Sequence, residues 1–218
     1  MDNIESAELS ERMRAVVSLS WNLFSRKVGN GLIPINKEAS MQLQYAYILH
    51  QIAPLIVFQE NESFSVELET GVIAQERSRE IDILFSTECD HQKYSIAIEM
   101  KCYRTQSSSG GKRGATDIFM KDVYEDLYLL EQYVEEEIAN EGVALVMNDL
   151  ENFVHPKKKE AKCWDYDISH EASFGPVSLS TSIGGKDISI NLKKCYKIAW
   201  AKVGEFWFLE AQGKECNK

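Results

Sequence analysis

Three consecutive segments in the middle of the chain alternate apolar and polar residues with a period of two, and this pattern constrains the fold more than any other feature. The segments span residues 64–69, 80–86 and 95–103. Successive side chains of a strand point to opposite faces, so each segment predicts one apolar and one polar face. The short connectors at 71–78 and 87–93 favour an antiparallel meander of three strands.

Residues with helical spacing flank this meander. Apolar residues recur at helical spacing over residues 5–28, and a second helix is expected to begin after Asn36 as its N-cap. A long helix is predicted over residues 116–140, with Gly142 marking its end. The apolar run 143–147 is typical of a strand buried on both faces. A long helix between two strands indicates a right-handed parallel crossover.

The C-terminal third carries weaker patterns. Residues 150–192 fit neither period, whereas residues 195–209 predict a hairpin around Gly204. We therefore expect a single domain over residues 1–218, with an N-terminal helix at 5–28, a core at about 36–149, and an irregular region and hairpin at 150–210. The fold class is α/β, with a mixed β-sheet flanked by helices. In that sheet a parallel strand after a crossover helix joins the antiparallel meander.

Charge and cysteine content narrow the class of protein. The chain has 24 Lys and Arg residues against 34 Asp and Glu residues, a formal net charge of −10, so any surface that binds phosphate must be local. Its apolar runs are too short to span a membrane, and its first residues lack the features of a secretory signal. Five cysteines without a CxxC pair favour reduced thiols. These features predict a cytoplasmic protein.

Candidate chemistry lies on the polar face of the meander. The period of two puts Asp82 on the polar face of the second strand, and Glu99 and Lys101 on the polar face of the third. Antiparallel pairing brings these side chains onto one surface, where two carboxylates offer hard oxygen ligands for Mg²⁺. Lys101 would orient or deprotonate an attacking water, or stabilise transition-state charge. The alternative is a simple ion pair between Glu99 and Lys101 on a solvated face.

At these residues the chain resembles the PD-(D/E)XK nuclease superfamily. Asp82 and the tripeptide Glu99-Met100-Lys101 match its signature, with Ile81 in place of the name-giving Pro. The order of predicted elements over residues 36–149 is similar to the core of that superfamily. The resemblance implies a restriction-endonuclease-like fold and a DNA endonuclease that uses Mg²⁺, with Mn²⁺ as a substitute. It also implies a role in restriction, other defence or repair, and an active homodimer.

Further residues are candidates for supporting roles. Glu38 resembles the acidic residue that members often add from the preceding helix, although a carboxylate in a first helical turn is also favoured by the helix dipole. Glu80 shares the polar face as a candidate metal support, or is simply solvated. The candidate phosphate contacts follow the third strand, with solvated charges as the default alternative. They are Arg104, Lys112, Arg113 and Lys121.

Two expectations concern partners. The acidic residues in the far part of the long helix, Asp126 among them, should face away from DNA. The competing interpretation of the whole chain is a non-catalytic, nuclease-like fold that acts as a nucleic-acid- or protein-binding subunit of a larger complex. The net charge of −10 favours this alternative, in which the chain either relies on a basic partner subunit to hold DNA or does not contact DNA at all.

Overall fold

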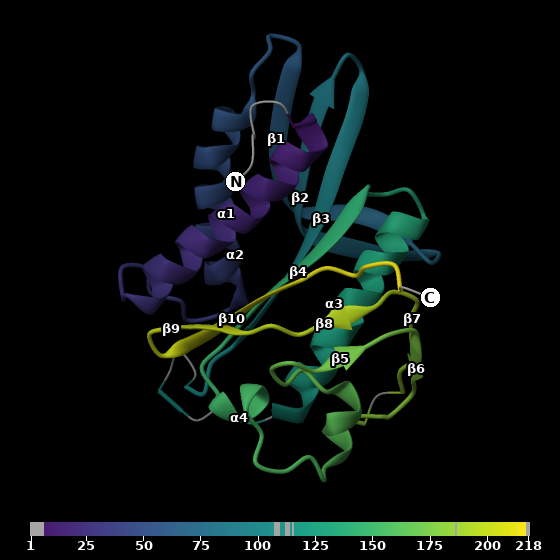
Figure 1. The fold of residues 1–218 in the computed structure, drawn as a ribbon. Coiled ribbons are helices and arrows are strands. Elements are labelled where there is room, and N and C mark those ends of the chain that lie inside the picture. The colour runs from purple at the N-terminus through teal and green to yellow at the C-terminus, as the bar shows by residue number, and fades with distance from the viewer. Residues whose placement is uncertain (1–6, 107–109, 112–113, 115, 186, 217–218) are drawn as a thin grey trace.

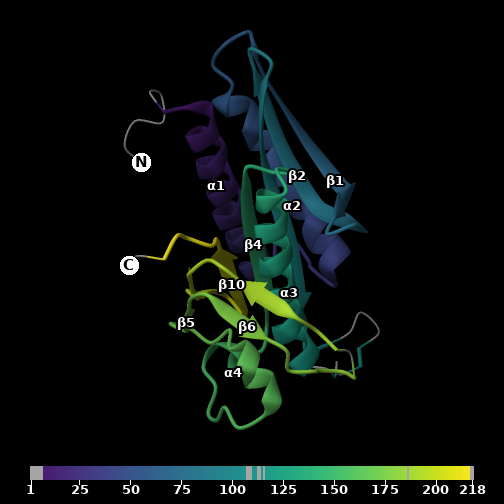
Figure 2. The ribbon, with the colours of Figure 1, turned by 90° about the vertical axis from the view of Figure 1, so that its right-hand side faces the viewer.

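A six-stranded sheet lies between two helices on one face and one helix on the other (Figure 1). The computed structural model describes residues 7–106, 110–111, 114, 116–185 and 187–216. Helices α1 (Leu9–Gly29) and α2 (Glu38–Ile52) cover one face, and α3 (Thr116–Glu135) covers the other. Figure 2 views the side on which α3 lies in front of β4. The α/β class and the flanking helices are thus confirmed.

The sheet has the order β1-β2-β3-β4-β10-β9. Its strands are β1 (Glu62–Ala74), β2 (Arg77–Cys89), β3 (Gln92–Tyr103), β4 (Glu141–Asn148), β10 (Phe206–Ala211) and β9 (Ala201–Val203). The pairs β1–β2, β2–β3, β4–β10 and β10–β9 are antiparallel, whereas β3 and β4 are parallel. The meander and the parallel crossover are therefore confirmed, and the predicted hairpin at the C-terminus extends the same sheet.

The strands of the meander are longer than the sequence pattern predicts. The expected connectors shrink to two two-residue turns, one at Gln75 and Glu76 with φ of 51° and 59°, the other at Asp90 and His91 with φ of 50° and 66°. Both central residues with positive φ fit the hairpin turn whose twist matches that of its strands. The sequence did not predict these turns because they contain no glycine.

The predicted helix ends need three corrections. Helix α1 begins at Leu9 rather than at residue 5, and residues 5 and 6 lie outside the described residues. The N-cap of α2 is Lys37, not Asn36, because Ser40 Oγ accepts the backbone N–H groups of both residues at 3.2 and 3.1 Å. Helix α3 ends at Glu135 rather than near residue 140.

Gly142 does not end a helix. It lies in β4, where a Cβ atom would come within 2.8 Å of Leu130 Cβ. The glycine is therefore needed for the close approach of α3 to the sheet.

Both faces of β3 are buried over residues 95–100. Ile83, Phe85, Ile98 and Met100 pack beneath α1 and α2, as the alternation predicted. The opposite face, expected to be polar and open, is covered by α3, so that Glu99 is only 5% exposed. The alternative of a solvated face at Glu99 and Lys101 was therefore wrong, because the crossover helix that connects β3 to β4 packs on that face.

The β1–β2 hairpin bends sharply at Glu69 and Asp82. Glu69 has a φ of 51°, and regular pairing resumes on either side, at Leu68 with Ile83 and at Thr70 with Ile81. Ile83 packs in the core under α1 and α2, whereas Ile81 packs in the core under α3. Residues two apart share a face of a regular strand, so β2 turns over at Asp82. Its pairing with β3 also stops at Ile83, and the hairpin then leaves β3 (Figure 1).

The C-terminal third packs against α3. It contains α4 (Glu151–Val154), the 3₁₀ turn η3 (Lys162–Tyr166) and two short antiparallel pairs. The pairs are β5 (Ser173–Phe174) with β8 (Tyr196–Lys197), and β6 (Val177–Leu179) with β7 (Ile190–Leu192). A further 3₁₀ turn, η2 (Ala53–Ile56), follows α2. Among the described residues, no helix is long and apolar enough to cross a membrane.

A buried glutamate fastens the C-terminal third to α3. Glu131, 3% exposed, accepts the backbone N–H groups of Lys193 and Lys194 at 2.7 and 3.1 Å and the hydroxyl of Tyr196 at 2.8 Å. The carboxylate is therefore satisfied inside the protein rather than placed on an acidic outer surface.

Two cysteines form a disulfide, which corrects the expectation of reduced thiols throughout. Cys195 and Cys216 are bonded, with their Cα atoms 5.2 Å apart. The backbone of Cys195 pairs with that of Lys214 at 2.8 and 3.0 Å, and this pairing brings the C-terminal tail beside residue 195. An odd number of cysteines does not exclude one bonded pair, and a separation of 21 residues matches no recognisable spacing.

Candidate functional site

The bend at Asp82 creates a gap in the hydrogen bonding of β3, and two carboxylates fill it. Once β2 departs, the backbone N–H groups of Met100 and Cys102 lose their strand partner. Asp82 Oδ2 accepts the N–H of Met100 at 2.6 Å, and Glu38 Oε2 accepts that of Cys102 at 3.2 Å. Buried backbone donors require such partners. The fold therefore fixes both acidic side chains against the same strand edge.

Lys101 lies between these acids and α3. Its Nζ is 3.5 Å from Glu38 Oε1 and 3.4 Å from Asp126 Oδ2, and its side chain is 21% exposed. Burial disfavours the charged amine, but the negative charges of Asp126, Glu38, Asp82 and Glu99 outweigh it and raise the pKa of Lys101. Lys101 is therefore held as an ammonium group. Its ion-pair partners are Glu38 and Asp126, and the simple pair with Glu99 is not formed.

Glu99 is a buried acid with an unsatisfied oxygen. Its Oε1 makes no hydrogen bond of normal geometry in the described part of the chain. The hydroxyl of Tyr133, which also lacks such a partner, interacts with this carboxylate and opposes the rise of its pKa. Burial raises the pKa of Glu99 strongly, and the charges of Asp126 and Asp82 raise it further. A buried carboxylate oxygen without a hydrogen bond of normal geometry is unfavourable, so this oxygen has the capacity to bind a proton or a cation.

Asp82 is less buried than Glu99, and its pKa is also raised. Burial raises its pKa to about 6, against the lowering effect of the Met100 N–H, and the charge of Glu38 adds to the rise. Deprotonation near neutral pH leaves Asp82 as a carboxylate beside Lys101.

Asp126 is the member of the site that sequence reasoning missed. It is 8% exposed and lies against Lys101 rather than on an outer acidic surface. Burial raises its pKa strongly, and the ammonium of Lys101 opposes this effect. A signal was present in the sequence. Asp126 occupies a position in the buried stripe of α3 between Val123 and Leu130, where an acidic residue is unexpected.

The other predicted site residues are arranged differently. Glu80 is exposed, lies opposite Gly71 beyond the bend, and makes no ion pair or hydrogen bond with another described side chain. Arg104 forms an ion pair with Asp149 at 2.9 Å, and its guanidinium carbon lies 4.7 Å from the centre of the Phe206 ring. Both contacts hold Arg104 against the protein.

Lys121, a candidate phosphate contact, is only 5% exposed. It pairs with Asp122 at 2.9 Å and Glu125 at 2.6 Å on its own helix. The two remaining candidates, Lys112 and Arg113, lie outside the described residues.

The residues present fit a cation site with few protein ligands. Across the described ranges, no three His, Cys, Asp or Glu side chains are grouped so as to hold a metal ion. Oε1 of buried Glu99 makes no hydrogen bond of normal geometry, and the charge of Asp82 raises the pKa of Glu99. These two carboxylates fit a hard cation that takes its other ligands from water and substrate. Comparison with protein-family models, curated proteins and solved structures gave no significant match.

Proposed function

We propose that this protein is a Mg²⁺-dependent phosphodiesterase, specifically a DNA endonuclease of the PD-(D/E)XK type acting in restriction, other defence or DNA repair. One observation carries the proposal: Lys101 is kept charged by carboxylates at the point where β2 leaves β3, beside the unsatisfied oxygen of Glu99. Sites with perturbed acids and a buried cation in a cleft are typical of catalysis.

Each side chain has a role in this proposal. Asp82 and Glu99 would hold Mg²⁺, or Mn²⁺ in its place. Such an ion, when bound, lowers the pKa of a coordinated water and offsets charge on the phosphate oxygens. Lys101 provides a fixed ammonium group for the charge that develops on the phosphate or for orientation of the nucleophile. Asp126 and Glu38 position Lys101 through their ion pairs at 3.4 and 3.5 Å. Cleavage of both strands requires two such sites, so a homodimer is the expected active unit.

The test is conversion of supercoiled plasmid to nicked or linear DNA. Wild type should convert the plasmid in Mg²⁺ and in Mn²⁺ but not in EDTA. Asp82→Asn should lose this conversion, because the amide retains an acceptor for the Met100 N–H but cannot serve as an anionic ligand. Discrete products would indicate sequence specificity. Equal cleavage by wild type and Asp82→Asn would contradict the assignment of the site.

The second candidate is a non-catalytic binding subunit with the same fold. The net charge of −10 and the pairing of Arg104 and Lys121 within the protein favour it. Thermal unfolding separates the two proposals, because an ion that binds only the native state must stabilise it. A rise of the unfolding temperature in Mg²⁺ that is absent in Asp82→Asn supports the enzyme, and an unchanged temperature supports the binding subunit.

A further inference from the structure

A cavity of about 780 Å³ lies beside Lys101 and Asp126. It is bounded by α3, by the far end of the β1–β2 hairpin and by residues 187–190. Arg77 and Arg79 contribute to its wall. The cavity is large enough for a nucleotide unit, because small-ligand sites commonly occupy roughly 300–1,000 Å³.

The bend at Asp82 is what brings the two arginines to this cavity. On a regular strand Arg77 and Arg79 would share the face of Ile83, which packs beneath α1 and α2. Because β2 turns over at Asp82, they lie on the α3 side instead, together with Ile81. The same deformation therefore positions Asp82 and directs two cationic side chains to the cavity that adjoins Lys101.

These arginines differ from the other cations near the site. Within the described residues, neither forms an ion pair or a side-chain hydrogen bond, and Arg79 Nε is buried with no partner. Two acids of the cavity wall, Asp122 and Glu125, share the single ammonium group of Lys121. Asp126 pairs with Lys101, and Asp187 accepts the hydroxyl of Ser182. Among the described residues that line the cavity, Arg77 and Arg79 are thus the cations that no carboxylate pairs with.

We propose that Arg77 and Arg79 bind a backbone phosphate of nucleic acid adjacent to the phosphodiester presented to Lys101. A guanidinium group donates two parallel hydrogen bonds to a phosphate, and both arginines line the cavity. This inference rests on the proposed function. It identifies the local basic surface that a protein with a net charge of −10 requires.

The test is DNA binding without cleavage. Fluorescence anisotropy of a short fluorescein-labelled duplex, titrated in EDTA, compares wild type with the double variant Arg77→Gln/Arg79→Gln. The matched control is Arg26→Gln, an exposed arginine at the end of α1 on the opposite side of the sheet. The double variant should bind about tenfold more weakly, and its affinity should depend less on salt by about one phosphate contact. The control should bind as wild type does.

Three results would overturn the inference: no binding by wild type, equal binding by the double variant, or an equal loss in Arg26→Gln. Competition by a free mononucleotide as effective as that by unlabelled duplex would also contradict the assignment to nucleic acid. If the double variant fails to fold by circular dichroism, Arg77→Lys/Arg79→Lys replaces it. That variant keeps the charge but loses the paired donors, and it should still bind more weakly than wild type.

The outcome is separable from that of the proposed function. Arginine-dependent binding without any plasmid cleavage would reject the endonuclease and leave the phosphate site intact. Metal-dependent cleavage with unchanged binding by the double variant would reject the phosphate site alone.

Discussion

Asp126 Oδ2 on α3 lies 3.4 Å from Lys101 Nζ on β3, and this ion pair joins the helix to the catalytic strand of the proposed site. We predict that Asp126→Asn lowers the cleavage rate about 10- to 100-fold, a range typical of residues that support a metal site from outside its ligands. The free energy of unfolding should fall by less than about 3 kcal/mol, because Lys101 loses one partner charge but keeps its ion pair with Glu38. Single-turnover rates and urea denaturation measure the two effects.

The matched variant for this position is Asp126→Glu, which keeps the charge. It should recover part of the rate lost in Asp126→Asn. A rate for Asp126→Asn equal to that of wild type would show that the ion pair has no role in positioning Lys101.

The second prediction concerns the pH dependence of stability at Asp82. Its folded pKa of about 6 lies above the ordinary value of 3.8, so its contribution to stability is fully present below pH 3.8 and is lost as the pH rises through 6. The loss amounts to at most roughly 3 kcal/mol. In metal-free buffer, Asp82→Asn should therefore gain stability relative to wild type between pH 4 and pH 7. Denaturant titrations across this range measure it, and a constant difference would contradict the prediction.

The third prediction concerns Glu62, whose pKa is lowered on folding, whereas that of Asp82 is raised. Its carboxylate pairs with Arg12 at 2.5 and 3.1 Å, and Arg12 also donates to the Ile56 carbonyl. The Arg12 hydrogen bonds lower the pKa of Glu62, so this contribution to stability is present above the ordinary pKa of 4.5 and is lost as the pH falls. Glu62→Gln should cost about 3 kcal/mol at pH 7, because Arg12 stays buried without its partner charge.

The measurement for Glu62 is the difference in unfolding free energy between variant and wild type at pH 7 and at pH 3. The difference should shrink at the lower pH. An equal difference at both values would mean that the ionised pair adds nothing to stability.

The fourth prediction concerns the disulfide between Cys195 and Cys216. Closure of a loop between residues 21 apart should stabilise the oxidised protein by about 3 kcal/mol. Cys216→Ser should lose this stabilisation, whereas Cys89→Ser, at a cysteine outside the bond, serves as the control. Denaturation with and without a reducing agent gives the free energies. Alkylation of Cys195 in the non-reduced protein would contradict the bond.

The sequence predicted most of the meander because its two faces differ in polarity along regular strands. Ile98 and Met100 lie beneath α1 and α2 as their spacing indicated, and β4 is the parallel strand expected after the long helix. The polar residues Asp82 and Lys101 also lie near one another, as shown by the effect of each charge on the pKa of the other. Alternation within single strands was sufficient for these features.

The remaining features depend on contacts between distant segments. The bend at Glu69 and Asp82 reverses the faces of β2 beyond it, and a period of two cannot show where it reverses. Lys121 and Arg104 were candidate phosphate contacts, but each forms an ion pair with an acidic residue of this chain. Pairing of Cys195 with Cys216 likewise depends on a backbone contact with Lys214.

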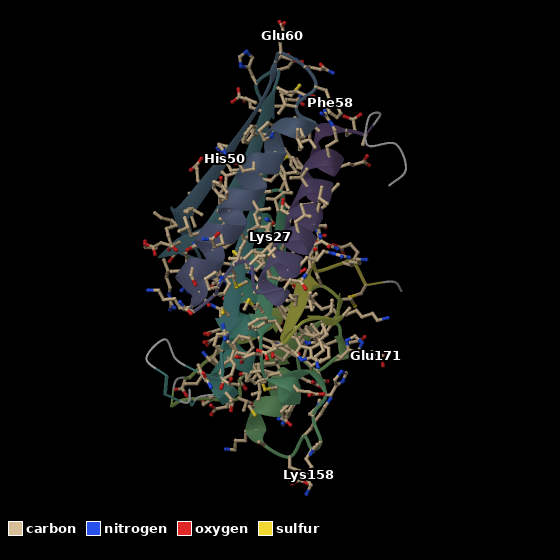
Figure 3. The ribbon with its side chains drawn as sticks, turned by 90° about the vertical axis from the view of Figure 1, so that its left-hand side faces the viewer. Lys27, His50, Phe58, Glu60, Lys158 and Glu171 are labelled. Carbon is tan, nitrogen blue, oxygen red and sulfur yellow. A yellow bond between two sulfur atoms is a disulfide. The ribbon has the colours of Figure 1, made fainter. Side chains whose placement is uncertain are left out.

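The most direct test of the central claim is the single-turnover cleavage rate of labelled duplex DNA in Mg²⁺ for Lys101→Ala. Its control is Lys27→Ala, an exposed lysine of α1 labelled in Figure 3. The proposal predicts a loss of at least about a hundredfold for Lys101→Ala, consistent with removal of one preorganised charge from a transition state. Lys27→Ala should cleave as wild type does. Cleavage by Lys101→Ala at the wild-type rate would contradict the assignment of this site as a nuclease centre.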